Sequence, residues 1–214
     1  MFDWKEFEVG HLLGHGRSEE IVNFCLNNHN NRELRPFSVT SREADLDLIL
    51  PVKTTGGKLI KERLSWLYSL YENDFLAYAQ KCSDEKLFVA SDERYAININ
   101  LQKGNKMRYE CHVDSNPIEG LLYLTDHPKG NGGELVISIN SLSKGPAEIR
   151  EDSVVLYPKK DHLVFFDARE NPHYVEPLSD ENNIRVVVAM NYYTHNCPES
   201  SRPKDLNIHL FGED

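Results

Sequence analysis

The chain has 214 residues, of which 40% are hydrophobic and 10% aromatic, and this composition suits one globular domain with a sizeable core. The net charge of −10 argues against broad binding to nucleic acids or anionic membranes, because both need a basic surface. No segment approaches the roughly 20 apolar residues of a membrane span, and the first residues lack the pattern of a secretory signal. We therefore expect a cytoplasmic protein.

The four cysteines, Cys25, Cys82, Cys111 and Cys197, are widely scattered and form no CxxC pair. Neither a disulfide framework nor a cysteine zinc site is therefore expected. Free thiols fit a reducing compartment, which agrees with a cytoplasmic location.

The first third of the chain is predicted to be partly helical. Ser18, the two glutamates after it and the apolar residues that follow have the pattern of a helix that ends in the polar residues 27–31. A short apolar strand is predicted near residues 46–50 and a flexible turn at residues 54–57. Leucines and aromatic residues then recur with helical spacing over residues 59–78.

After about residue 91 the pattern changes to short strands separated by turns rich in Gly, Pro, Asn and Asp. Many short strands at this spacing indicate a β-sandwich or jelly roll. Helices packed on such a core make the fold α+β. The predicted strands cover residues 95–101, 109–113, 120–125, 134–139, 153–157, 162–167, 173–176 and 184–193.

No stretch of the chain has the composition of a linker, so we expect a single domain over residues 1–214. Within it, residues 1–90 are expected to form a largely helical support and lid. Residues 91–193 would form the jelly-roll core, and residues 194–214 a C-terminal tail that is a candidate to cover the pocket.

A candidate metal site begins with His112 and Asp114. Alternation along a strand places residues i and i+2 on the same face, so this imidazole and this carboxylate point together into the interior. His173 begins a later predicted strand. Two histidines and one carboxylate are the facial triad of non-haem Fe(II) oxygenases, which leaves metal positions open for a bidentate oxoacid and O₂.

Arg185 begins the hydrophobic strand at residues 186–190. An arginine that faces a core is costly unless it is paired, and a fixed guanidinium can bind a carboxylate through two hydrogen bonds. Tyr123 can add a phenolic donor to the same carboxylate. The alternatives are an outward-facing arginine on an edge strand and an ordinary core tyrosine.

Residues from about 98 to 193 resemble the Fe(II)/2-oxoglutarate-dependent dioxygenases of the prolyl-4-hydroxylase-like branch in both the order and the spacing of their motifs. The resemblance covers somewhat under half of the chain. Its residues are His112-Val113-Asp114, Leu122-Tyr123-Leu124, Gly132-Gly133-Glu134-Leu135, Pro158, His162-Leu163-Val164-Phe165-Phe166-Asp167, His173-Tyr174-Val175-Glu176-Pro177-Leu178 and Arg185.

The resemblance implies a double-stranded β-helix with Fe(II) at one end and with 2-oxoglutarate and O₂ as co-substrates. It makes His112, Asp114 and His173 the metal ligands, Arg185 the residue that binds the co-substrate, and Tyr123 its helper. The related halogenases have Gly or Ala at the carboxylate position, so the aspartate here implies hydroxylation.

One departure concerns the co-substrate pocket. Gln102 stands where many relatives have a further tyrosine that contacts the co-substrate. The surroundings of the co-substrate therefore differ from the usual pattern.

The similarity to standalone hydroxylases suggests a small-molecule substrate, in particular a free amino acid. Such a substrate needs a cation to bind its carboxylate, and Arg169 is the candidate. It also needs an anion to bind its ammonium group, and the candidates are Glu93 and Glu119. Asn191 is a further candidate for substrate contact, because on a regular strand it shares a face with Arg185.

Three other functions stay open: a hydroxylase of peptide or protein residues, a non-catalytic jelly-roll binding module, and a cupin that binds another metal. A peptide substrate predicts an open groove, whereas a free amino acid predicts a pocket closed by the N-terminal segments. Gly56 and Gly57 are a candidate hinge for a lid. His127 lies in a polar segment and is expected to be exposed, and no motif indicates an oligomeric state.

Overall fold

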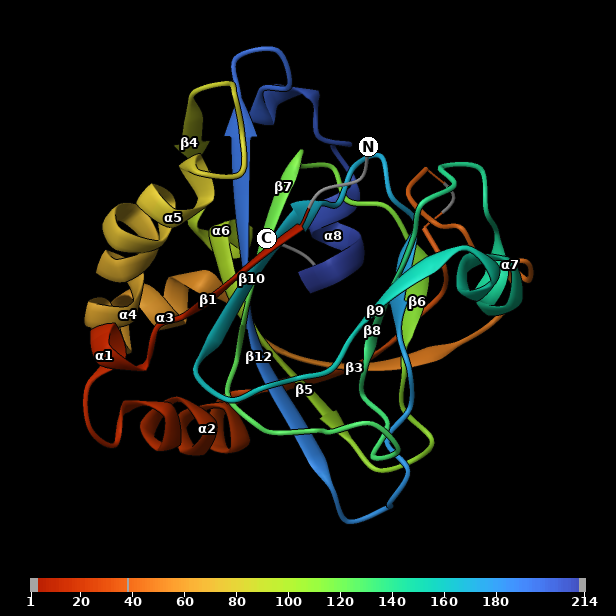
Figure 1. Cartoon of the computed structure of the whole chain (residues 1–214), viewed down its shortest axis with the longest axis horizontal. Coiled ribbons are helices and arrows are strands. Elements are labelled where there is room, and N and C mark those ends of the chain that lie inside the picture. The colour runs from red at the N-terminus through yellow and green to blue at the C-terminus, as the bar shows by residue number, and fades with distance from the viewer. Residues whose placement is uncertain (1–3, 38, 212–214) are drawn as a thin grey trace.

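The computed structural model describes residues 4–37 and 39–211, in which two antiparallel sheets face each other (Figure 1). The large sheet contains β1 (Trp4–Glu8), β2 (Asn30–Leu34), β3 (Leu50–Thr55), β4 (Leu87–Val89), β5 (Ile97–Lys103), β7 (Ile118–Tyr123), β10 (His162–Asp167) and β12 (Ile184–Thr194). The small sheet contains β6 (Tyr109–His112), β8 (Leu135–Ser138), β9 (Ser153–Leu156) and β11 (His173–Val175).

The large sheet has the order β1-β10-β7-β12-β5-β3-β2, with β4 paired to β12, and the small sheet has the order β6-β11-β8-β9. Strands distant in sequence are therefore neighbours, as in a jelly roll. The predicted α+β fold with a double-stranded β-helix core is confirmed.

The helices of the first hundred residues gather on one side of the large sheet (Figure 1). They are α1 (Gly10–Leu13), α2 (Arg17–Asn28), α3 (Gly57–Arg63), α4 (Ser65–Leu70), the π-helical turn η1 (Tyr71–Phe75), α5 (Leu76–Gln80) and α6 (Glu93–Ala96). The later helices are α7 (Gly145–Glu151), the 3₁₀ turn η2 (Glu199–Ser201) and α8 (Leu206–Phe211). None of the helices in the described ranges combines the length and the apolar character needed to cross a bilayer.

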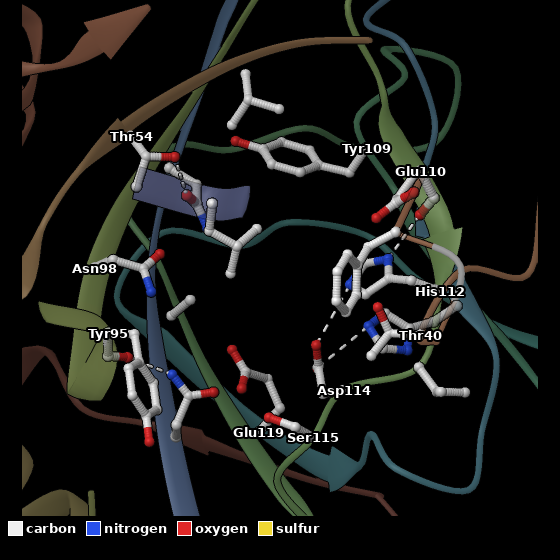
Figure 2. A pocket seen from close by; sticks show the side chains of 18 of the residues that line it. Thr40, Thr54, Tyr95, Asn98, Tyr109, Glu110, His112, Asp114, Ser115 and Glu119 are labelled. Carbon is white, nitrogen blue, oxygen red and sulfur yellow. Dashed lines mark hydrogen bonds and ion pairs between the residues drawn. The ribbon is translucent and has the colours of Figure 1, made fainter. Parts of the chain in front are cut away.

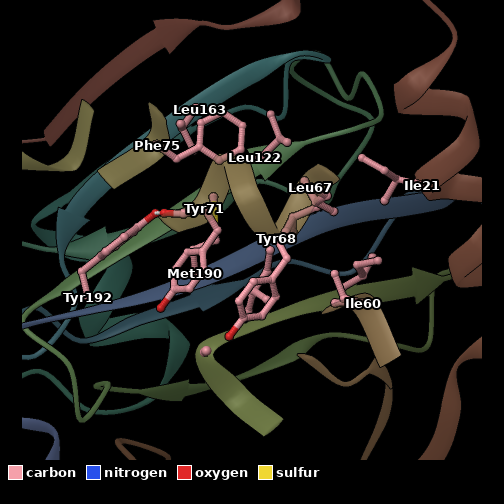
Figure 3. Close-up of a cluster of buried hydrophobic side chains, with 14 of the residues drawn as sticks. Ile21, Ile60, Leu67, Tyr68, Tyr71, Phe75, Leu122, Leu163, Met190 and Tyr192 are labelled. Atoms are coloured by element: carbon pink, nitrogen blue, oxygen red, sulfur yellow. Dashed lines mark hydrogen bonds between the residues drawn. The ribbon is translucent and has the colours of Figure 1, made fainter. Parts of the chain in front are cut away.

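The two faces of the large sheet pack against different partners. On the outer face, Leu122 and Met190 lie in one buried cluster with Leu67 and Phe75 of the helices (Figure 3). Burying a side chain of this size contributes about 2 kcal/mol, so the helices fix the sheet by their apolar faces. The inner face, which faces the small sheet, carries the odd-numbered residues of β7 and β12.

The predicted elements of the N-terminal part need three corrections. The strand expected at residues 46–50 starts only at Leu50, and the turn expected at residues 54–57 is wrong because β3 continues to Thr55 and α3 begins at Gly57. The helix over residues 59–78 is interrupted at Leu64, whose φ is −126°. The polar strands β1 and β2 were not predicted, since pairing with neighbouring strands outweighs their weak local propensity.

Gly57 is required by a close approach between α3 and α6. A Cβ atom at this position would lie 2.0 Å from the carbonyl oxygen of Glu93 and 2.6 Å from that of Ile97. Both contacts are with backbone, so neither can be relieved by a side-chain rotation. Gly57 is therefore a packing residue and does not act as the lid hinge suggested from the sequence.

Gly57→Ala is expected to lower the free energy of unfolding by about 3 kcal/mol, because α3 and α6 must separate to admit the methyl group. Urea unfolding followed by circular dichroism measures the change. Gly56→Ala is the matched control, since its Cβ would lie an ordinary 3.6 Å from the carbonyl oxygen of Arg94. Equal stability of the two variants would contradict this account.

Candidate metal-binding active site

His112, Asp114 and His173 lie close together. Figure 2 shows His112 and Asp114 pointing toward each other in the cavity. The antiparallel register of β6 and β11 places His112 directly opposite His173. One ligand atom from each of the three residues lies within 4.8 Å of the others. Nε2 of His112 lies 3.5 Å from Oδ1 of Asp114, and Nε2 of His173 lies 3.5 Å from Oδ2 of the same carboxylate. The three side chains predicted as a metal site are thus brought together.

The backbone orients both imidazoles. Nδ1 of His112 lies 2.7 Å from the carbonyl oxygen of Glu110, and Nδ1 of His173 lies 2.9 Å from that of Asn171. When each Nδ1 carries the proton and donates it to the carbonyl, each Nε2 presents a lone pair toward Asp114. This is the tautomer that binds a metal ion.

The charges of the three groups depend on one another. Burial alone would lower the pKa of His112, but the hydrogen bond and the charge of Asp114 outweigh it and raise that pKa to about 9. Burial and the neighbouring charge of His112 lower the pKa of His173 to about 4. Burial acts to raise the pKa of Asp114, yet the hydrogen bond from His112 and the nearby cationic groups hold it below its usual value. Without metal at neutral pH, His112 is therefore a positively charged imidazolium, whereas His173 is neutral.

A second group of polar atoms surrounds Arg185, which lines the same cavity. The side chain of Arg185 is only 1% exposed, and its Nε and Nη2 atoms make no hydrogen bond with the described residues. The buried hydroxyls of Tyr109 and Tyr123 also have no partner there. The guanidinium carbon of Arg185 lies 5.3 Å from the centre of the Tyr123 ring. Buried donors without partners cost free energy, so this arrangement fits an anionic ligand.

Tyr109 is a site residue that the sequence analysis missed. It lies three positions before His112, and simple alternation would turn the two side chains to opposite faces. The register of β6 against β11 shifts between His112 and Tyr109, so three residues of β6 span two residues of β11. Because of this bulge both side chains line the cavity.

Gln102 and His127 have structural roles near this end. Nε2 of Gln102 donates to the carbonyl oxygens of Met107 and Glu176, at 2.8 and 2.7 Å. The expectation that His127 is exposed is wrong. It is 4% exposed, and its Nε2 lies 2.9 Å from the carbonyl oxygen of Ile184. His127 thereby supports the start of β12, immediately before Arg185.

The cavity has a volume of about 200 Å³, and its lining includes Arg185, the three metal-site residues and residues of the C-terminal segment. Glu119 and Asn191, two of the four substrate candidates, line it. The other two lie elsewhere. Arg169 is exposed and donates to the carbonyl oxygen of Ser115, whereas Glu93 forms a 2.5 Å ion pair with Lys61.

The C-terminal segment lines part of the cavity with Arg202 and, from α8, Leu206, His209 and Leu210. Leu34, Phe37 and Val52 of β2, β3 and the residues after β2 also line it, and the ring centre of Phe37 lies 5.0 Å from that of His209. Among the described residues, the lining takes none from α1 to α5. The helices α2 to α5 instead cover the outer face of the large sheet (Figure 1).

Comparison with models of known families found a match for part of the chain. The model of the family described as the 2OG-Fe(II) oxygenase superfamily matches residues 95–193. The comparison with curated proteins gave no match.

Several solved structures share the fold. A 2OG-Fe(II) oxygenase family oxidoreductase from Burkholderia pseudomallei is 12% identical with a TM-score of 0.63, over 94% of this chain and 89% of that one. A prolyl hydroxylase from Trichoplax adhaerens, in complex with a peptide of hypoxia inducible factor, is 19% identical with a TM-score of 0.61, over 90% and 84% of the two chains. The α-ketoglutarate-dependent epimerase SnoN from nogalamycin biosynthesis is 14% identical with a TM-score of 0.60, over 89% and 78%.

Metal binding to the ligand-free site is expected to release about one proton at neutral pH, because only His112 must lose one. The apparent affinity for Zn(II) should therefore rise about tenfold per pH unit from pH 6 to 8, below the pKa of His112. Calorimetric titrations in buffers of different ionisation enthalpy measure the released protons.

The matched variant is Asp114→Asn, which removes the charge that holds the proton on His112. Its weaker Zn(II) binding should depend less on pH over the same interval. An affinity of the unchanged protein that does not vary with pH would contradict the assigned charge state.

Proposed function

We propose that the chain is a 2OG-Fe(II) oxygenase, an enzyme that uses Fe(II), 2-oxoglutarate and O₂, and that it hydroxylates an unactivated C–H bond of a free amino acid. The match of residues 95–193 to the family model supports this class. In this proposal His112, Asp114 and His173 hold the metal. Arg185 and Tyr123 bind 2-oxoglutarate.

The donor set supports the metal assignment. Two imidazole nitrogens and one carboxylate on one side of the ion suit Fe(II) and leave three coordination positions for other ligands. When bound, the iron supplies oxidative decarboxylation of 2-oxoglutarate to succinate and CO₂, with one oxygen atom of O₂ entering succinate and the other entering the hydroxylated product. The chain's own residues orient the reactants and exclude water.

The observation that carries the proposal is the buried Arg185 guanidinium, which has no acidic partner among the described residues. A carboxylate that accepts two of its N–H groups would satisfy the donors left unpaired. The hydroxyls of Tyr109 and Tyr123 would donate to the same group. A dicarboxylate bound there by its distal end has its oxoacid end directed along the cavity toward the metal site.

The size of the cavity supports a small substrate over a peptide. Its volume of about 200 Å³ is below the roughly 300–1,000 Å³ of drug-sized ligand pockets. Residues of α8 line it, whereas an extended peptide would need an open groove. The likeness to a prolyl hydroxylase with a bound peptide is a likeness of fold.

Arg185→Gln is expected to raise the dissociation constant for 2-oxoglutarate at least about 100-fold, because a paired buried charge contributes about 3 kcal/mol. Anaerobic titration of the Fe(II) protein with 2-oxoglutarate, followed by its metal-to-ligand absorption, measures the constant. Zn(II) affinity should stay within about threefold. Arg150→Gln is the control, since Arg150 forms an exposed ion pair with Glu176.

Stability gives an independent check on the same residue. Arg185→Met removes an uncompensated buried cation, so the ligand-free variant should melt at the same temperature as the unchanged protein or higher. Saturating 2-oxoglutarate should stabilise the unchanged protein alone. If the unchanged protein bound neither metal nor 2-oxoglutarate, the proposal would be wrong and a non-catalytic binding module would be the better interpretation.

A further inference from the structure

The inner face of the large sheet carries a polar group of residues at the end away from Arg185. Glu119 on β7 lies directly opposite Asn191 on β12, and Asn98 on β5 lies opposite Ala189 of the same strand. All three polar side chains line the cavity, and Figure 2 shows Glu119 beside Ser115. The metal and the co-substrate of the proposed function use none of them.

Glu119 is the only one of these residues that can carry a charge, and it is 6% exposed. Its Oε2 accepts a 3.0 Å hydrogen bond from the side chain of Asn116. No lysine, arginine or histidine of the described chain forms an ion pair with it. Burial and the charge of Asp114 raise its pKa well above the usual value. A buried carboxyl group without a cation is costly, so a cationic ligand would stabilise it.

The two asparagines add acceptors beside this carboxylate. Nδ2 of Asn191 donates to the carbonyl oxygen of Tyr95 at 2.5 Å, which leaves the amide oxygen as its other polar atom. The side chain of Asn98 makes no hydrogen bond with the described residues. An ammonium group has three donors, and a carboxylate with two amide oxygens offers three acceptors.

The C-terminal segment brings a cation to the same part of the cavity. The guanidinium carbon of Arg202 lies 3.4 Å from the centre of the Tyr95 ring, so the group stacks on that ring. Glu199 fixes the segment by accepting hydrogen bonds from the backbone of Ser91 at 2.7 Å and the hydroxyl of Tyr95 at 2.5 Å. Arg202 is close enough to Asp114 for its charge to act on that carboxylate.

The Glu119 carboxyl group and the Arg202 guanidinium thus both line the cavity that holds the three metal-site residues. We infer that Glu119 binds the ammonium group and Arg202 the carboxylate of one small zwitterionic substrate, whose C–H bond is thereby held beside the metal site. Asn98 and Asn191 complete the ammonium site. This inference rests on the proposed function and replaces Arg169 with Arg202 as the carboxylate-binding residue.

Equilibrium binding tests the inference without turnover. The full chain is loaded anaerobically with Mn(II) and 2-oxoglutarate, and the twenty common L-amino acids are titrated by calorimetry in three forms: free, N-acetylated and amidated at the carboxyl group. At least one free amino acid should bind, and either cap should weaken its binding at least tenfold. Absence of binding by every free amino acid at millimolar concentration would overturn the inference.

The variants assign each end of the ligand to one residue. Glu119→Gln should remove the preference for the free over the N-acetylated form, and Arg202→Gln should remove the preference for the free over the amidated form. Arg202→Lys should restore part of the second preference. Glu93→Gln and Arg169→Gln, which change charges outside the cavity lining, should bind within twofold of the unchanged protein.

Loss of both preferences in one variant, or equal effects of Glu119→Gln and Glu93→Gln, would refute the assignment. Failure of the proposed function is distinguishable, because it shows earlier, as a lack of Mn(II) or 2-oxoglutarate binding in the same samples. Proteins that bind both and still do not discriminate free from capped amino acids refute the substrate inference alone.

Discussion

The site depends on the register between β6 and β11, two short strands of the small sheet. This pairing sets His112 opposite His173, and the bulge beside it turns Tyr109 to the same side as His112. The backbone N–H of Asp114 donates to the carbonyl oxygen of Ala168, just beyond β10, at 2.9 Å. Backbone hydrogen bonds across both sheets therefore fix the three metal-site groups before any ligand binds. A shift of one residue in this register would turn an imidazole away from the others.

A single strand of the large sheet links the two halves of the proposed chemistry. β12 carries Arg185 near its start and Asn191 near its end, with the smaller Val187 and Ala189 facing the cavity between them. Six residues of extended strand span about 20 Å, which is room for a dicarboxylate and a small substrate arranged on either side of a metal ion. Because the even-numbered residues of β12 are held by the helices, this inner row has a fixed spacing.

The metal-site residues could be predicted from two patterns. Strand alternation relates His112 to Asp114, and the order and spacing of the family motifs relate both to His173. His112, Asp114 and His173 lie together, and Arg185 lies beside the ring of Tyr123. Two kinds of residue escaped prediction: those displaced by a bulge, such as Tyr109, and those placed by tertiary docking, such as Arg202. Arg169 and Arg202 look alike in the sequence, and only the docking of the C-terminal segment distinguishes them. The polar edge strands β1 and β2 escaped for a related reason, since their partners are remote in sequence.

The two groups of the inferred substrate site are positioned in different ways. Glu119 belongs to a central strand with neighbours on both sides, so its position is set by the sheet. Arg202 belongs to a segment that docks through side-chain contacts, among them the hydrogen bond of Glu199 with Tyr95 and the stacking of Arg202 on the same ring. The segment that supplies the cation also continues into α8, which lines the cavity. A substrate that binds both Glu119 and Arg202 would therefore link the C-terminal segment to the large sheet. Binding of the substrate would then also hold α8 in place beside the cavity.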